Sequence, residues 1–125
     1  LDEALTEWSV ALYAEDAYGT YAEYIDIFRQ EYQQWEQERG ISVIGQPAPA
    51  YSTAAYSPVV YRKGAIFFHR LREQLGDAAF FAALRAYFTN YQYDIATPFD
   101  LQSILEAQHG AELDALFFEW VGYSN

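Results

Sequence analysis

The sequence contains no cysteine and no methionine, and only 7 of its 125 residues are lysine or arginine. Without cysteine the chain can form neither disulfides nor thiolate metal sites, whereas oxidising and reducing compartments both stay open. Its 18 acidic residues bring the formal net charge to -11. Because nucleic acids and anionic membranes are bound by clustered basic side chains, we expect neither of them as a partner.

Long apolar runs are also missing, although apolar residues are abundant. No stretch approaches the roughly 18 residues of a membrane-spanning helix, and no signal peptide is visible. Hydrophobic residues nevertheless make up 52% of the chain, and aromatic residues make up 19%. This composition and length suffice for the core of one domain, so we expect residues 1–125 to fold as a single domain.

The spacing of the apolar residues predicts helices almost throughout. These residues recur at i, i+3 and i+4, and no convincing alternation of period two appears. About six helices without an internal repeat indicate an irregular bundle, so the predicted fold class is all-α. The expected boundaries are Gly19 and Gly40 after the first two helices, one long loop at residues 41–55, Asp77 and Thr97 as caps of the fourth and fifth helices, and Gly110 after the fifth.

One tyrosine of the third predicted helix is a candidate catalytic residue. Ser57 is a favourable N-cap and Pro58 a favourable first residue, so we expect the helix to begin there. Tyr61 would then lie in the first turn, with its hydroxyl directed toward the open end of the helix. A phenol stays protonated near neutral pH and can donate a hydrogen bond to an oxyanion. The alternative is a structural tyrosine at a helix start, one of 12 in the chain.

Two short motifs resemble those of the gluzincin aminopeptidases, the zinc peptidase family of the aminopeptidase N and leukotriene hydrolase type. The family's Tyr-x-Lys-Gly-Ala helix is matched by Tyr61-Arg62-Lys63-Gly64-Ala65, and a second family tyrosine five residues earlier is matched by Tyr56. The family's Trp-Leu-Asn/Asp-Glu-Gly helix is similar to Leu1-Asp2-Glu3-Ala4. The resemblance implies that Tyr61 stabilises the tetrahedral intermediate and that Glu3 is the third zinc ligand.

The resemblance extends over nearly the whole chain. Residues 70–77, 97–101, 109–113 and 117–120 are similar to the closing helices of the family. It therefore implies the helical half of a thermolysin-like metallopeptidase domain, namely the C-terminal helical part of the catalytic domain. The parent protein would bind peptide substrates and hydrolyse their N-terminal bond with zinc-activated water.

The other zinc ligands of the family are absent from this sequence. The family spacing places the His-Glu-x-x-His motif upstream of Leu1, so we interpret the chain as a fragment of a larger catalytic domain that packs against the upstream part of the same polypeptide. Catalytic zinc requires three protein ligands. We therefore expect the isolated chain to bind no zinc and to be inactive.

The other polar residues near these motifs have ordinary explanations. Glu3 itself can be an acidic residue favoured by the dipole at a helix start. Lys63 is expected to pair with a carboxylate, Glu7 to be solvated, and Gly64 to allow the close approach of a neighbouring helix. The two histidines are not expected to bind metal: His69 lies about two turns beyond Tyr61, and His109 precedes a helix-ending glycine.

Two other functions remain open at the level of sequence. One is a glycyl-type gluzincin aminopeptidase, although the continuation Arg70-Leu71-Arg72 fits the aminopeptidase N type better. The other is a non-catalytic helical scaffold, a pseudo-peptidase that keeps the fold without zinc chemistry.

Overall fold

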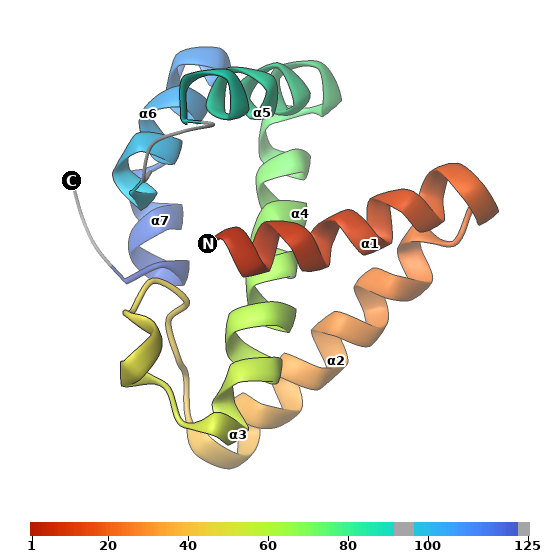
Figure 1. The fold of residues 1–125 in the computed structure, drawn as a ribbon, viewed down its shortest axis with the longest axis vertical. Helices are drawn as coiled ribbons and strands as arrows, with labels where there is room; N and C mark the ends of the chain where they lie inside the picture. Colours follow the sequence, from red (N-terminus) through yellow and green to blue (C-terminus); the bar gives the residue numbers. More distant parts are fainter. Residues whose placement is uncertain (92–96, 123–125) are drawn as a thin grey trace. The chain divides into compact units, whose positions relative to one another are not determined.

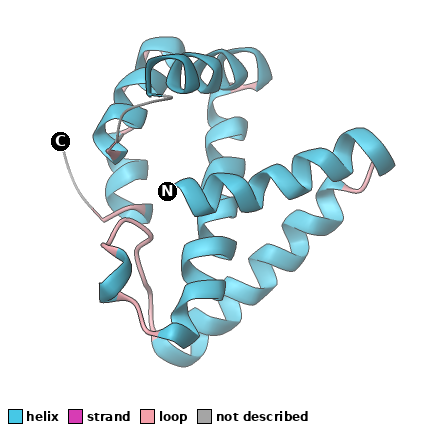
Figure 2. Ribbon diagram, in the orientation of Figure 1, coloured by secondary structure: helices cyan, strands magenta, loops and turns pink. Residues whose placement is uncertain are grey.

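The computed structural model describes residues 1–91 and 97–122, and all regular structure within them is helical (Figure 2). Because residues 53–75 are helical without a break, the described residues form six helical bodies, which confirms the predicted all-α class. No helix in this part of the chain is long and apolar enough to cross a membrane. The elements are α1 (Asp2–Tyr18), α2 (Tyr21–Arg39), the 3-10 turn η1 (Ala48–Ala50), α3 (Thr53–Ala55), the π-helical segment η2 (Tyr56–Lys63), α4 (Gly64–Leu75), α5 (Asp77–Tyr91), α6 (Pro98–His109) and α7 (Asp114–Trp120) (Figure 1).

The chain divides into two compact units, and the first of them, Leu1–His69, is built from three helical sides. Figure 1 shows α1 and α2 joined by a tight turn; the third side is the long helix of α3, η2 and α4, which belongs to this unit as far as His69. The turn contains Gly19 in the left-handed conformation (φ 68°), as the predicted helix end requires. The buried apolar residues of this unit include Leu5, Trp8, Ile25, Phe28, Val59, Ile66, Phe67 and Phe68.

The long helix begins earlier than predicted. Its N-cap is Ser52, whose side chain accepts a hydrogen bond from the Ala55 amide at 3.2 Å, so the prediction of Ser57 as N-cap was wrong. Pro58 therefore lies inside the helix, where a proline lacks the amide hydrogen and clashes with the preceding turn of a regular α-helix. The π-helical turns of η2 cover this position, and α-helical geometry resumes at Gly64. As a result, Tyr61 lies about two turns inside the helix rather than in its first turn.

Gly64 brings α1 and the long helix into direct contact. Its backbone has ordinary helical angles (φ -59°, ψ -43°), so the position does not need the conformational freedom of glycine. A Cβ atom placed there would overlap with the Cβ of Ala4 and lie 3.3 Å from the Ala4 Cα. The glycine thus serves the close approach of the two helices, as predicted.

The second unit, Arg70–Asn125, is held by an apolar core and by a buried amide. Gln102 of α6 is fully buried and donates hydrogen bonds to Glu106 (3.1 Å) and Asp114 (2.6 Å). Glu106 also accepts from the Leu113 amide at 2.6 Å, which ties the start of α7 to α6. The apolar residues buried in this unit include Leu71, Phe80, Ala83, Leu84, Leu101, Leu105, Leu113, Phe117 and Val121.

Residues close in sequence determine both ends of α6 and contact the start of α5. Thr97 and Asp100 form a capping box, in which the Thr97 amide donates to Asp100 at 2.8 Å and the Asp100 amide donates to Thr97 at 3.2 Å. Gly110 ends α6 with a φ of 77°, so both predicted boundaries of α6 are confirmed. Asp77 is the first residue of α5 rather than its cap, and its carboxylate accepts from Arg72 at 2.8 Å.

We expect Gly64→Ala to lower the free energy of unfolding by about 1–3 kcal/mol, because the added methyl group overpacks the contact with Ala4. Helix propensity alone predicts the opposite sign, since alanine is favoured over glycine by up to about 1 kcal/mol. Urea denaturation of the protein and its variant measures the difference. The control is the double variant Ala4→Gly with Gly64→Ala, which moves the methyl group to the other helix and should recover part of the loss. A Gly64→Ala protein as stable as the original would contradict the close contact.

The capping box predicts a pH dependence of stability. The hydrogen bond from the Thr97 amide, followed by those from the Thr97 and Tyr91 side chains, holds the pKa of Asp100 below its usual value. A lowered folded-state pKa means that the stabilisation is present above the unfolded value of about 3.9 and is lost as the pH falls through the folded value. Asp100→Asn should therefore lower the free energy of unfolding at pH 7 and have less effect at pH 2 to 3. Urea denaturation across this range, with Thr97→Ser as the control that keeps the hydroxyl, tests the prediction; an equal effect at all pH values would refute it.

Candidate functional site

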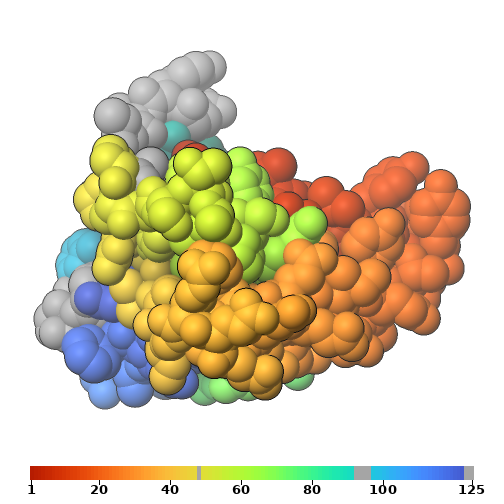
Figure 3. Space-filling view, turned by 90° about the horizontal axis from the view of Figure 1, so that it is seen from below, coloured from red at the N-terminus to blue at the C-terminus, as the bar shows by residue number. Residues whose placement is uncertain are grey.

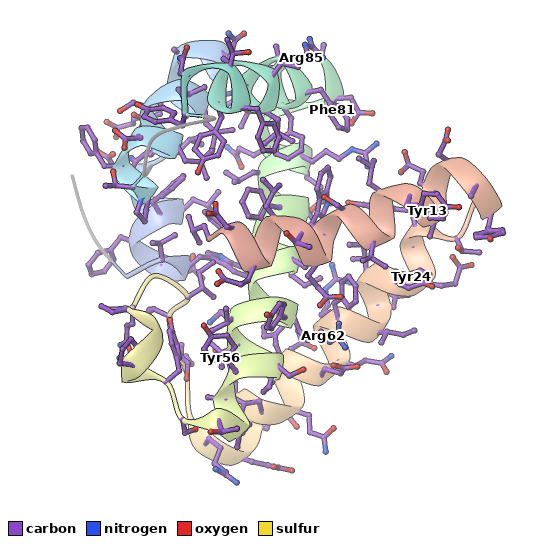
Figure 4. The ribbon with its side chains drawn as sticks, viewed as in Figure 1. Tyr13, Tyr24, Tyr56, Arg62, Phe81 and Arg85 are labelled. Carbon is purple, nitrogen blue, oxygen red and sulfur yellow. The ribbon has the colours of Figure 1, made fainter. Side chains whose placement is uncertain are left out.

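The side chain of Arg62 links the long helix to both other sides of the first unit. Its Nη1 lies 2.7 Å from Glu7 of α1, and its Nε lies 2.6 Å from Glu31 of α2. The guanidinium carbon lies 5.1 Å from the centre of the Phe28 ring. In Figure 4, Arg62 lies on the side of the helix that faces α2, and Tyr56 lies on the opposite side. The residue directly after Tyr61 therefore holds three helices together.

Lys63 makes a second link, toward the end of α2 and the segment that follows it. Its side chain is 6% exposed, and its Nζ lies 2.6 Å from Glu36 and 2.5 Å from the Ser42 carbonyl. The Ser42 amide donates to the same Glu36 oxygen at 3.1 Å. The prediction that Lys63 pairs with a carboxylate is confirmed. Figure 3 shows the elements that it joins next to one another, with α2 in orange, the loop in yellow and the start of the long helix in yellow-green.

Glu7 is not solvated, so that prediction was wrong. Its side chain is only 18% exposed and pairs with Arg62. The reason is the crossing of the helices: once Ala4 of α1 meets Gly64, the next turn of α1 lies beside Arg62. The acidic and basic residues are visible in the sequence, but nothing in their spacing shows which of them meet.

Glu3 lies in the first turn of α1, next to the helix crossing. It directly precedes Ala4, which contacts Gly64, and it is exposed. Residues four apart lie on the same helix face, so Glu3 and Glu7 share a face of α1. The contacts of Ala4 and Glu7 thus hold the start of α1, with Glu3, against residues 62–64 of the long helix.

Tyr61 is half-buried at the end of a row of three tyrosine rings. The ring of Tyr56 lies 5.8 Å from that of Tyr61 and 6.3 Å from that of Tyr51. Because a π-helix bonds residues five apart, Tyr56 and Tyr61 stay close to one another along η2. Although the long helix begins earlier than predicted, it still brings together Tyr56 and Tyr61, the two tyrosines of the motif.

The first tyrosine of the row is anchored to the preceding loop. The Tyr51 hydroxyl donates to the Val43 carbonyl at 2.6 Å and accepts from the Gln46 amide at 3.1 Å. Burial raises the pKa of Tyr51, with a smaller contribution of the same sign from Tyr56, while the bond from Gln46 opposes both. The hydroxyl is therefore protonated at neutral pH, and it both donates and accepts a hydrogen bond. Tyr51 thus anchors its end of the tyrosine row to the loop before it.

Both histidines lie in structural surroundings. His69 Nδ1 is 2.9 Å from the Tyr21 hydroxyl, which also accepts a bond from the Trp8 indole at 3.0 Å. His109 is the last residue of α6, before Gly110. Within residues 1–91 and 97–122, no three His, Cys, Asp or Glu side chains form a group that could hold a metal ion.

Comparison with known proteins identifies the family. The peptidase family M1 domain matches residues 1–120. The chain is 37% identical over 65 residues to aminopeptidase N of Lactococcus lactis subsp. lactis, a match that covers 52% of this chain and 8% of that protein. It is 28% identical over 131 residues to aminopeptidase M1 of Arabidopsis thaliana, with 91% of this chain and 15% of that protein covered.

The chain thus spans 15% or less of the length of these curated relatives. No solved structure matches it. The family match nevertheless extends over nearly all of the chain. The chain belongs to peptidase family M1, in the aminopeptidase N type of gluzincins that its sequence resembles.

Proposed function

We propose that the chain is part of the catalytic domain of a zinc-dependent aminopeptidase, in which Glu3 is a zinc ligand and Tyr61 is an oxyanion donor. One observation carries the proposal: Ala4 and Glu7 hold the start of α1 against Gly64 and Arg62. A metal ligand and an oxyanion donor that act on one carbonyl group must come from neighbouring segments. The crossing of α1 and the long helix supplies such neighbours.

The Glu3 carboxylate suits the proposed metal. Zinc is bound by carboxylate oxygens as well as by histidine nitrogens, and Glu3 is exposed rather than engaged in the core. One carboxylate cannot hold zinc tightly, so the other ligands would come from other parts of the parent polypeptide, against which this chain would pack. We expect the isolated chain to be metal-free and inactive. When bound, zinc supplies a Lewis acid and lowers the pKa of bound water.

Tyr61 is suited to stabilise negative charge. Its hydroxyl can donate a hydrogen bond, and the contact of its ring with Tyr56 restricts the positions that the hydroxyl can take. A donor that is already oriented toward the developing oxyanion needs no reorganisation during the reaction. The substrates would be peptides with a free N-terminus, in agreement with the names of both relatives.

The same names favour the aminopeptidase N type over the glycyl type of gluzincin. A non-catalytic scaffold would retain the same helices without the chemistry, since a fold does not determine a function. The two functions differ in their dependence on single side chains. A catalytic role requires Glu3 and Tyr61, whereas a scaffold requires only the surface that binds its partners.

For Tyr61 we expect a large loss of turnover without a loss of metal. Tyr61→Phe in the full-length polypeptide that carries this chain should lower kcat about 100-fold to 1000-fold, because one oxyanion donor is removed. Hydrolysis of an aminoacyl p-nitroanilide measures the activity, and elemental analysis measures the zinc content. Tyr13→Phe is the matched control, since Tyr13 of α1 is 65% exposed. Full activity of Tyr61→Phe would remove this residue from the mechanism.

For Glu3 we expect the loss of both metal and activity. Glu3→Ala in the same polypeptide should reduce zinc content and hydrolysis together, because a catalytic zinc site with one ligand removed binds the ion weakly. Glu15→Ala, an exposed acidic residue farther along α1, is the control. Unchanged zinc content in Glu3→Ala would contradict its role as a ligand, and absence of zinc from the parent protein itself would favour the scaffold.

A further inference from the structure

We infer that Arg62, through its ion pair with Glu7, is a positioning residue that aligns the α1 segment carrying Glu3 with the segment carrying Tyr61. The inference rests on the proposed function of those two residues. Arg62 directly follows Tyr61, and Glu7 lies one helical turn after Glu3. The ion pair therefore joins the residue directly after Tyr61 to the residue one helical turn beyond Glu3.

The guanidinium of Arg62 is held at two different nitrogens. Nη1 contacts Glu7 at 2.7 Å and Nε contacts Glu31 at 2.6 Å. Because the group is planar and rigid, two such contacts fix its orientation, and its position over the Phe28 ring restricts it further. A lysine ammonium at this position would have no comparable fixed geometry.

The two carboxylates differ in burial. The side chain of Glu7 is 18% exposed, whereas that of Glu31 is 42% exposed, and that of Arg62 is 25% exposed. Exposed pairs are screened by water and salt, and their contribution is small. The link from Arg62 to α1 is therefore less screened than its link to α2.

The ion pair adds a polar contact to the apolar packing of α1. The contact of Ala4 with Gly64 sets how closely the helices approach, and the burial of Leu5 and Trp8 already limits the rotation of α1 about its axis. The pair of Glu7 with Arg62 restricts this rotation further, at the residue next to Tyr61. Since Glu3 and Glu7 lie on the same face, the rotation that the pair restricts is the one that would move Glu3 relative to Tyr61.

The test compares Glu7→Gln with Glu31→Gln in the full-length polypeptide that carries this chain. Both variants remove one negative charge from Arg62, but only Glu7 lies on the helix that carries a candidate site residue. Small misplacements of reacting groups cost up to about 100-fold in rate. We therefore expect Glu7→Gln to lower kcat about 10-fold to 100-fold with little change in KM, and Glu31→Gln to lower it less than about 3-fold. Glu7→Asp, which keeps the charge, should retain more activity than Glu7→Gln.

Two further measurements separate positioning from general structural damage. If Glu7 acts through Tyr61, the effect of Glu7→Gln on kcat should largely disappear in the Tyr61→Phe background, whereas unrelated defects add up. The affinity for a phosphinic tetrahedral analogue, measured by calorimetry, should fall in Glu7→Gln and not in Glu31→Gln. Zinc content should stay the same in both variants.

The outcomes distinguish this inference from the proposed function. Equal losses in Glu7→Gln and Glu31→Gln, or full additivity of Glu7→Gln with Tyr61→Phe, would overturn the role of Arg62. Either result leaves the proposed function intact as long as Tyr61→Phe alone lowers kcat. If Tyr61→Phe has no effect, the proposed function fails, and the inference fails with it.

Discussion

The missing side chain of Gly64 is the constraint on which the rest of the first unit depends. It allows the backbone of α1 to lie directly against the long helix at Ala4. At this separation Glu7, on the next turn of α1, lies 2.7 Å from the guanidinium of Arg62. Lys63 then joins the same stretch of the long helix to α2 and the following loop. Three consecutive residues thus connect the long helix to its surroundings by three different means: a steric fit, a guanidinium bridge and a buried ammonium.

The irregular part of the long helix lies next to these contacts. Pro58 excludes regular α-helical geometry, and the π-helical turns of η2 extend from Tyr56 to Lys63. π-helical turns occur frequently at functional sites because they change which side chains lie together. Here they bring Tyr56 next to Tyr61, with Tyr51 completing the row. The π-helical turns and the ion pairs of Arg62 and Lys63 therefore lie in the same short segment, η2.

Most local signals were predicted correctly, whereas the identities of the long-range partners were not. The helix ends at Gly19 and Gly110 and the Thr97 cap depend on residues close in sequence, and the structure confirms them. Ser57 failed as a cap because the loop before it already contains a capped helical turn that continues through Pro58. The environment of Glu7 could not be predicted, since it depends on how two distant helices cross. The roles of Glu3 and Tyr61 stay predictions until the variants are measured.

The burial of Lys63 has a consequence for the chemistry of the protein surface. Lys63 is the only lysine in the sequence, and its amino group is enclosed between Glu36 and the Ser42 carbonyl. The positive side chains on the outside of this chain are therefore arginines, whose guanidinium groups do not react like amines. Acetylation, ubiquitin attachment and amine-directed cross-linking all require an accessible ε-amino group. For this part of the protein, exposing that group requires breaking its contacts with Glu36 of α2 and with the Ser42 carbonyl of the following loop.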